Sequence, residues 1–186
     1  PYIDPLTIDL DGSFTFDKHL KDVTRQLSDG TASSIIRGVP IYTYDRKGNA
    51  NAALKFDGNY YVSIQNVPVQ QNMSLSVWVK RTATFTDTPP IIRHNSTGIA
   101  LMQDGDAFWG RVLSYTTSET TSIISNNFID QAWHHIVITY AADKMAMYVD
   151  GQLQTKTTNV FSITDLMTKY LLGYGYANGG KYWNGI

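Results

Sequence analysis

The sequence predicts an all-β fold of antiparallel strands, arranged as a sandwich or a barrel. Hydrophobic and polar residues alternate with a period of two in many short runs, for example in residues 74–80. Turn-forming triplets such as Asp57-Gly58-Asn59 and Asp104-Gly105-Asp106 interrupt these runs. No segment shows helical periodicity over three turns. Many short strands at regular spacing are typical of sandwiches and barrels.

Strands are expected along the whole chain, and the hairpin at Asp150-Gly151 is the best defined, because both of its turn positions tolerate a positive φ. Two stretches are predicted differently: residues 17–27 as a short helix or an irregular loop, and residues 163–169 as a single helical turn. The expected strands are residues 6–10, 52–56, 60–64, 74–80, 90–94, 98–103, 107–114, 121–125, 133–140, 144–151, 152–157 and 169–174.

Length and composition indicate one globular domain, residues 1–186, taken from a larger protein because the chain opens with Pro1. The net charge of −1 and the absence of a basic stripe argue against nucleic-acid binding. No apolar run is long enough to insert into a membrane. The absence of cysteine excludes disulfides, thiolate metal sites and cysteine nucleophiles.

Four motifs, in this order, carry a family resemblance: FDG at 56–58, LSVW at 75–78, WHH at 133–135 and YVDG at 148–151. The chain resembles the laminin G-like domains of the concanavalin A-like lectin/glucanase superfamily from about residue 6 to residue 186. The resemblance implies a two-sheet antiparallel β-sandwich of the jelly-roll type. It also implies an extracellular protein, or one on the surface of a cell or virion.

The sequence departs from the family pattern at its end. In the family, the stretch after the equivalent of residues 183–186 continues as a last strand beside the first, and here the chain stops at Ile186. Either the chain is truncated, or another chain supplies a strand to the open sheet edge. The second alternative predicts homo- or hetero-assembly through that edge.

Catalysis is not expected. Retaining glucanases of this fold need two carboxyl groups about 5 Å apart, and this chain has one glutamate, Glu119, in a turn-like segment. Asp104 and Asp106 flank Gly105 and look like hairpin residues. No Gly-x-Ser-x-Gly elbow is present for a serine nucleophile. The chain is therefore predicted not to be an enzyme.

One structural Ca²⁺ is the metal expectation. His134 and His135 are adjacent on a strand and point to opposite faces, so they cannot chelate one ion together. Relatives carry a calcium ion near the loop that follows the first strand. The resemblance places the candidate ligands at Asp11, Asp22 and Asp57. The alternative is that these aspartates cap turns.

Aromatic residues among glycine, asparagine and aspartate are the candidate carbohydrate site, because flat rings stack on sugar faces and polar groups bind hydroxyls. Half of these rings belong to the core under the alternative interpretation, and Trp78 and Trp133 are expected to be core residues. The candidate residues are Asp104, Asp106, Trp109, Arg111, Tyr174, Tyr176, Asn178, Tyr182 and Trp183.

Two functions follow from these observations. The first is a non-catalytic carbohydrate-binding or adhesive module that recognises a glycan or a surface protein. The second is a structural or assembly domain that contacts neighbouring chains, such as a virion decoration, a tail or fibre component, or a spacer.

Overall fold

The computed structural model describes most of the chain as strands and connecting turns. The described residues contain no helix, and therefore none suited to crossing a membrane. They are 13–24, 30–34, 39–82, 88–95, 97–114, 117–128, 130–141, 144–158, 161, 163, 167–175 and 181–186.

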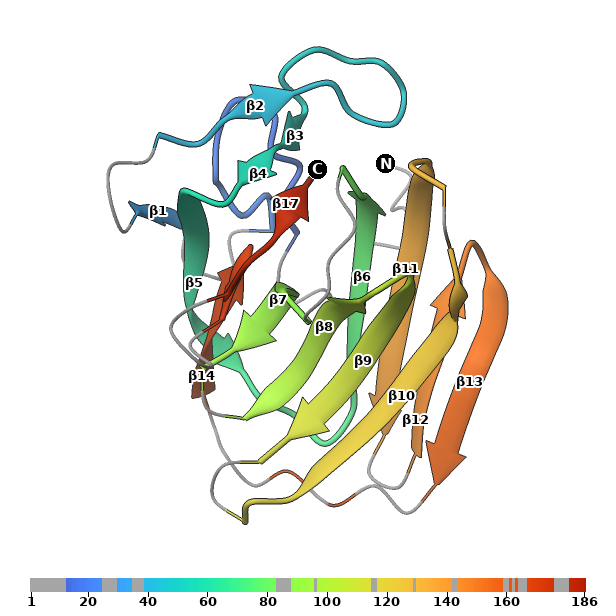
Figure 1. Ribbon diagram of the computed structural model, residues 1–186. Coiled ribbons are helices and arrows are strands. Elements are labelled where there is room, and N and C mark those ends of the chain that lie inside the picture. The colour runs from blue at the N-terminus through green and yellow to red at the C-terminus, as the bar shows by residue number, and fades with distance from the viewer. Residues whose placement is uncertain are drawn as a thin grey trace, which may run out of the picture.

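Two antiparallel sheets form the fold (Figure 1). The seven-stranded sheet has the order β1 (Thr31–Ser34), β5 (Tyr60–Pro68), β14 (Met167–Leu172), β7 (Pro90–His94), β8 (Gly98–Asp104), β9 (Ala107–Leu113) and β10 (Thr120–Asn127). The four-stranded sheet has the order β13 (Gln152–Thr158), β12 (Lys144–Val149), β11 (Trp133–Ala141) and β6 (Met73–Lys80).

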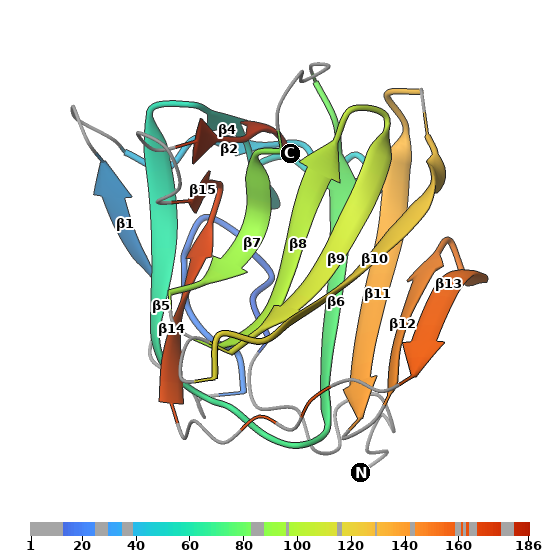
Figure 2. The ribbon, with the colours of Figure 1, turned by 60° about the horizontal axis from the view of Figure 1, so that its bottom comes forward.

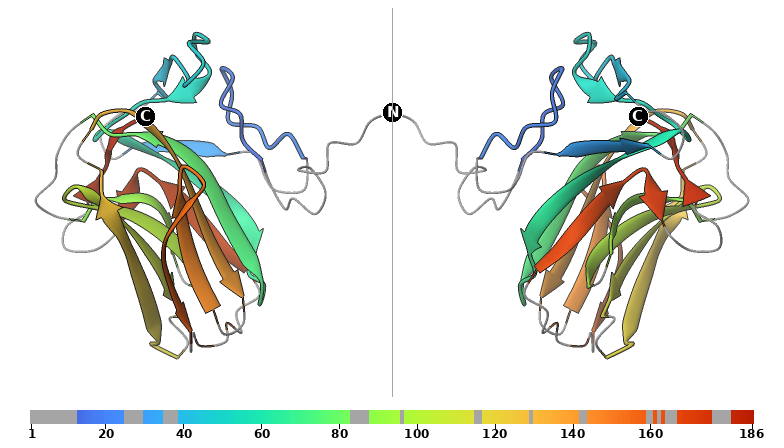
Figure 3. Two further views of the ribbon diagram at one scale, coloured as in Figure 1. Left: turned by 90° about the vertical axis from the view of Figure 1, so that its right-hand side faces the viewer. Right: turned by 90° about the vertical axis from the view of Figure 1, so that its left-hand side faces the viewer.

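Three short strand pairs complete the architecture. They are β2 (Tyr42–Thr43) with β3 (Ala53–Leu54), β4 (Phe56–Asp57) with β17 (Asn184–Gly185), and β15 (Tyr174–Gly175) with β16 (Lys181–Tyr182). In Figure 2, β9 and β10 of the larger sheet cross in front of β6 and β11 of the smaller one, and Figure 3 shows the layers from the side. The all-β antiparallel sandwich predicted from the sequence is confirmed.

The core lies between the two sheets and follows the alternation of each strand. On β11, Ile136 and Ile138 are fully buried, and on β9 Phe108 and Val112 face them from the other sheet. Gly110 lies between the layers, where an added Cβ would stand 2.8 Å from the Met147 Cε and 3.0 Å from the Ile138 Cδ1. A side chain at this position would require the ends of these two core side chains to shift.

Most predicted strands are confirmed within one to three residues, and the hairpin turn at Asp150-Gly151 has a positive φ at both residues, 51° and 77°. The run 52–56 is divided into two short strands, β3 and β4. The sequence did not predict β1 and β2, which are short and lack clear alternation. Residues 17–24 form no helix, residues 167–169 belong to β14, and residues 6–10 lie outside the described residues.

Trp78 and Trp133 are not core residues, so that expectation was wrong. Trp78 is 41% exposed, and Trp133 is half-buried opposite Lys80 on the outer face of the four-stranded sheet. Trp78 stacks on His135 of the neighbouring strand with ring centroids 4.9 Å apart, and the Arg46 guanidinium lies 4.2 Å from its ring centroid. Since Val79 and Ile136 point inward, the period of two already places both tryptophans on the outer face.

The last residues of the chain are paired. Gly185 pairs with Phe56, and Ile186 exchanges two backbone hydrogen bonds with Lys80, of 2.9 and 2.8 Å. These bonds attach the segment to both β4 and β6 at one end of the sandwich (Figure 1).

Candidate functional site

The side of the seven-stranded sheet that faces away from the four-stranded sheet, called the open face below, carries the polar and aromatic side chains that best fit a binding site, next to buried residues such as Leu171 and Ala100. On β9, Phe108, Gly110 and Val112 are buried against the core, whereas Trp109 and Arg111 alternate with them and are half-buried on the other side. The alternation of one strand thus places a ring and a guanidinium side by side on the open face.

One row of the open face carries two arginines around a small residue. Arg111 pairs with Ala100 on β8 and with Ser122 on β10, and Arg93 on β7 pairs with Leu171 on β14. On the other side of β7, Ile92 pairs with Leu101 of β8. Because β7 and β8 are antiparallel, the next residue of β7, Arg93, lies beside Ala100 of β8. Ala100 is 2% exposed, so this position offers almost no accessible surface.

The next row of the open face is apolar and aromatic. Trp109 pairs with Met102 on one side and with Ile124 on the other, and Ile124 is 50% exposed. At the opposite side of the sheet, Tyr61 of β5 stacks on Tyr174 with ring centroids 5.0 Å apart. Aromatic rings therefore lie at both sides of the open face: Tyr61 and Trp109 are half-buried, and Tyr174 is buried, with 9% of its surface exposed. Arg93 on β7 lies between the two sides, and Arg111 lies beside Trp109 on β9.

A third ring extends the tyrosine stack, because Tyr182 contacts Tyr174 at 4.8 Å between centroids. Burial raises the pKa of Tyr182, and the neighbouring hydroxyls of Tyr174 and Tyr61 add to this effect. Its buried hydroxyl makes no hydrogen bond within the part of the chain that the structure describes. The group stays protonated at neutral pH and keeps its capacity to donate a hydrogen bond.

Arg111 is oriented by contacts on its own face. Its Nε donates a 2.8 Å hydrogen bond to the Thr120 Oγ1, and its Cζ lies 5.9 Å from the centroid of the Trp109 ring. Because the Thr120 hydroxyl is neutral, this hydrogen bond fixes the guanidinium without cancelling its charge. A flat ring beside an oriented cation can bind the apolar face of a sugar together with its polar substituents.

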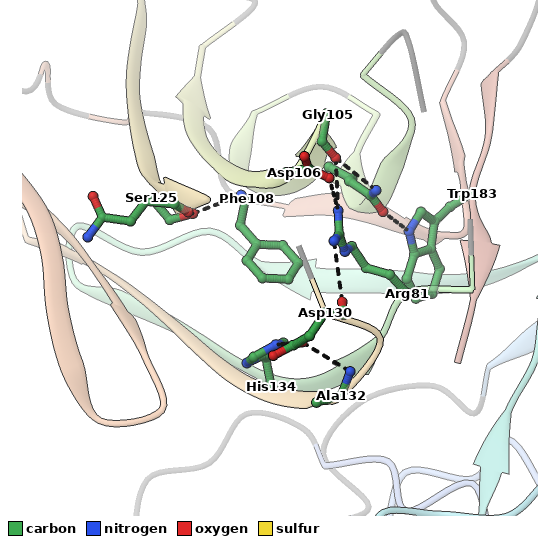
Figure 4. Close-up of polar contacts among 11 residues, drawn as sticks. Arg81, Gly105, Asp106, Phe108, Ser125, Asp130, Ala132, His134 and Trp183 are labelled. Atoms are coloured by element: carbon green, nitrogen blue, oxygen red, sulfur yellow. Dashed lines mark hydrogen bonds and ion pairs between the residues drawn. The ribbon is translucent and has the colours of Figure 1, made fainter. Parts of the chain in front are cut away.

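A second polar cluster closes one end of the sandwich and is structural (Figure 4). Arg81, 4% exposed, donates to the Gly105 carbonyl and to the Asp106 carboxylate at 3.1 Å each, and to the Asp130 carbonyl at 3.3 Å. The buried Gln103 side chain joins the same turn to the core: its amide donates to the Gly105 carbonyl, and its oxygen accepts from the Trp183 Nε1. This network fixes the β8–β9 turn.

His134 continues the cluster but is not placed for catalysis. Its Nδ1 lies 2.7 Å from the Asp150 carboxylate and its Nε2 lies 2.8 Å from the Asp130 carboxylate. With both ring nitrogens facing carboxylates, the ring has no nitrogen left to accept a proton from a nucleophile or a substrate. The expectation that His134 and His135 point to opposite faces is confirmed, because His135 stacks outside on Trp78.

The described residues do not gather a metal site. They contain no group of three histidine, aspartate or glutamate side chains that could share an ion. The Asp22 Oδ1 accepts from the Ser13 and Thr24 amides, and its Oδ2 accepts from the Thr24 hydroxyl. Asp57 accepts both hydrogen bonds of its turn from Asn59, and Asp11 lies outside the described residues. The hydrogen bonds of Asp22 and Asp57 match the turn-capping alternative.

The predicted carbohydrate residues separate into several environments. Trp109 and Arg111 lie together on the open face, Tyr174 and Tyr182 lie in the tyrosine stack, and Asp104 is exposed at the end of β8. Burial removes Trp183 from the candidates because the ring is 1% exposed in the core, and Asp106 is held by Arg81. Tyr176 and Asn178 lie outside the described residues.

Sequence reasoning missed Tyr61, Arg93 and Ile124 as residues of the open face. The signal for Tyr61 was present, because Val62 and Ile64 alternate with it and are buried. Arg93 likewise stands between Ile92 and the buried His94. What the sequence lacked was the strand order, which brings these three strands onto one sheet.

Comparison with known proteins agrees with this architecture. The family model of the concanavalin A-like lectin/glucanases superfamily matches residues 56–186. Domain 4 of AbnA, a GH43 extracellular arabinanase from Geobacillus stearothermophilus solved in complex with arabinotriose, superposes with a TM-score of 0.71. The sequences are 18% identical, over 94% of this chain and 87% of that chain.

Toxin domains have the same fold. A structure of botulinum neurotoxin type C, whose cell entry depends on two ganglioside molecules, gives a TM-score of 0.68 at 12% identity, over 95% of this chain and 43% of that one. The binding domain of botulinum neurotoxin DC in complex with rat synaptotagmin II gives a TM-score of 0.64 at 13% identity, over 87% and 42%. None of the curated protein sequences matches this chain.

Proposed function

Because the chain belongs to the concanavalin A-like lectin/glucanase superfamily, we propose that it is a non-catalytic carbohydrate-binding module whose ligand lies on the open face. One observation carries the proposal: Trp109 and Arg111 stand side by side on that face, opposite the stack of Tyr61, Tyr174 and Tyr182. Binding, and not catalysis, is the chemistry that these groups provide.

The width of the open face favours an oligosaccharide over a single sugar. Tyr61 on β5 and Trp109 on β9 are four strands apart in the sheet order, which corresponds to roughly 19 Å. A ligand of several sugar units can contact both aromatic ends at once. Rings at both ends supply apolar contact, and Arg111 beside Trp109 orients the chain of sugars.

The solved structures of the same fold support a glycan as the partner. The arabinanase domain was crystallised with arabinotriose, and the neurotoxin type C study concerns two ganglioside molecules. A surface protein is the other proposed partner, in line with the synaptotagmin complex. The description of the arabinanase as extracellular supports the proposed extracellular or surface location.

The absence of catalysis is supported by the carboxylates that the structure describes. Glu119, the chain's one glutamate, is exposed in the turn before β10. Asp130 and Asp150 face one another only across His134, which both of them bind. Asp106 is paired with Arg81. Hydrolysis of a panel of polysaccharides would contradict this part of the proposal.

The test compares the two exposed faces of the sandwich. Trp109→Ala removes the half-buried ring from the open face, and Trp78→Ala removes the more exposed ring from the outer face of the other sheet. Binding is measured on a glycan array and by calorimetry with arabinotriose. Loss of a central tryptophan costs about 2 kcal/mol or more, so Trp109→Ala is expected to weaken binding roughly thirtyfold and Trp78→Ala to leave it unchanged.

Two outcomes would overturn the proposal. One is the absence of binding to any glycan at millimolar concentration. The other is loss of binding in Trp78→Ala with retention in Trp109→Ala, which would place the site on the other sheet. Assembly through a sheet edge is a separate proposal, with β1 and β10 at the edges of the larger sheet. Light scattering tests it, because a monomer at high concentration would contradict it.

A further inference from the structure

The charged residues in the strands of the four-stranded sheet are all cationic. These strands contain no aspartate or glutamate, and their lysines are Lys80, Lys144 and Lys156. Lys80 follows the buried Val79, and Lys156 pairs with Ala146, which alternates with buried methionines. The side chains of Lys80 and Lys156 therefore lie on the outer face of this sheet, although the chain as a whole has a net charge of −1.

Arg46 adds a further cation to the outer face. It comes from the connection between β2 and β3, and its Cζ lies 4.2 Å from the centroid of the Trp78 ring on the edge strand β6. Trp78 stacks in turn on His135, whose Nε2 lies 2.9 Å from the Ser76 hydroxyl. This series of contacts orients the exposed guanidinium above the sheet.

The neighbouring acids do not neutralise these cations. The carboxylate of Asp45, next to Arg46 in the chain, accepts two backbone amides of its own turn and the Asn49 side chain. Asp150, in the turn after β12, binds His134 and a backbone amide of β11. Within the part of the chain that the structure describes, no ion pair involves Arg46 or the lysines of β6 and β13. Their charges therefore remain available to a partner.

Aromatic and apolar side chains lie between the cations. Lys80 and Lys156 belong to opposite edge strands, three strand spacings or roughly 14 Å apart across the sheet. Between these edges are Trp133, which pairs with Lys80, and Tyr148, which pairs with Leu153. Leu153 is 49% exposed. Tryptophan, tyrosine and arginine are the residue types that contribute most to binding in protein–protein interfaces.

From these observations we propose that the outer face of the four-stranded sheet binds a protein partner through an acidic segment that also carries apolar side chains. The inference goes beyond glycan binding, because it assigns a different class of partner to the second face of the sandwich. Carboxylates of the partner pair with Arg46 and the lysines, and its apolar side chains pack on the rings and on Leu153. A sugar fits this face less well, since Arg46 and His135 both occupy ring surface of Trp78 on which it would stack.

The probes are two soluble peptides of about ten residues, a length that spans the face when the peptide is extended. One peptide carries glutamates between tyrosines and serines, and the other carries glutamines in their place. Calorimetry and tryptophan fluorescence measure their binding to the full chain at low and at physiological salt. The glutamate peptide is expected to bind roughly tenfold more tightly than the glutamine peptide, and the difference is expected to shrink with salt.

Matched variants locate the contact. Lys80→Gln and Trp78→Ala are each expected to remove most of the preference for the glutamate peptide and to leave arabinotriose binding unchanged. Lys169→Gln removes a cation that is also half-buried, from β14 of the other sheet, and is expected to leave the preference intact. If circular dichroism shows that Trp78→Ala does not fold, Arg46→Gln replaces it, since this variant removes the charge and keeps the ring.

The possible failures are distinguishable. Equal affinity for the two peptides, or binding of neither at millimolar concentration, overturns the inference and leaves the proposed function to its own test with arabinotriose. A preference that disappears in Lys169→Gln and persists in Lys80→Gln also overturns it. Vesicles with and without phosphatidylserine are the third probe: a preference for the anionic vesicles without one for the glutamate peptide would overturn the inference in favour of a membrane surface. Absence of glycan binding with the peptide preference retained overturns the proposed function alone.

Discussion

Replacing His134 tests the most distinctive polar contact of the fold, the histidine between Asp130 and Asp150. The ring is 7% exposed and packs edge-on against Phe128, with centroids 4.9 Å apart. His134→Leu keeps an apolar side chain in this place and removes both hydrogen bonds to carboxylates. His135→Leu, one residue along the same strand but on the outer face, is the matched control.

The pH dependence follows from the direction of two pKa shifts. Burial lowers the pKa of His134, but the hydrogen bonds to Asp150 and Asp130 outweigh this effect and raise it above its usual 6.5. The hydrogen bond from His134 holds the pKa of Asp130 below its usual 3.8. The stabilisation by the histidine is complete below pH 6.5 and is lost as pH rises through the raised pKa. The stabilisation that comes from the ionised carboxylate of Asp130 is present above pH 3.8 and is lost on acidification.

The magnitude follows from the contacts and their exposure. Protonated His134 donates two charge-assisted bonds, each worth about 1.5–3 kcal/mol in a buried site. The carboxylates are 60% and 44% exposed and become hydrated in the variant, so the low end applies. His134→Leu should lower the free energy of unfolding by about 3 kcal/mol at pH 5.5. At pH 9, where neutral histidine has one N–H to donate, the loss should shrink to about 1 kcal/mol.

Urea unfolding of both variants and the parent protein between pH 5 and pH 9 measures these differences. The neighbouring charges that face the ring are Asp130, Asp150 and, beyond the Asp130 carbonyl, the guanidinium of Arg81. A loss for His134→Leu that is equal at pH 5.5 and pH 9, or that grows with pH, would refute the reasoning. So would the same pH profile in His135→Leu.

Three further predictions concern single features of the fold. Gly173 and Gly48 both have a φ of 81°, but an added Cβ overlaps the Phe56 ring at Gly173 and meets nothing within 4 Å at Gly48. Urea unfolding should therefore show a loss of about 3 kcal/mol or more for Gly173→Ala and about 1 kcal/mol for Gly48→Ala, and equal losses would contradict the packing. Arg81→Met should cost about 2–4 kcal/mol in the same assay and lower proteolytic resistance at the β8–β9 turn, whereas an unchanged stability would contradict the network. The structural Ca²⁺ expected at Asp11, Asp22 and Asp57 remains a proposal: millimolar calcium should raise Tm by a few degrees, and an unchanged Tm would exclude the ion.

Local sequence patterns predicted individual strands correctly. The type of a residue alone did not predict whether its side chain is buried. The alternation of β6 and β11 placed Val79 and Ile136 in the core, and the same alternation places Trp78 and Trp133 outside. The expectation that large rings are buried conflicted with this periodicity, and the periodicity was right. At Trp183 the periodicity gives no guidance, because the segment around it has little alternation. Its burial becomes evident only in the structure, where it contacts the buried Gln103.

The candidate site was predicted only in part for a related reason. Trp109 and Arg111 are two residues apart on one strand, so the sequence could pair them. Asp106 looked equally suited to bind a ligand, but the pairing with Arg81 depends on a residue 25 positions away. Contacts at such separations have no local signature, and the burial that makes them strong comes from both sheets together.

The sequence by itself determined most of the antiparallel strands, the alternation of their inward and outward residues and the Asp150-Gly151 turn. Each of these depends on the geometry of a few consecutive residues. Only the tertiary structure decided that Tyr61, Arg93 and Trp109, from strands distant in the chain, share one face. Strand order is set by how the whole set of apolar faces packs into one core, and that is a property of all the strands at once.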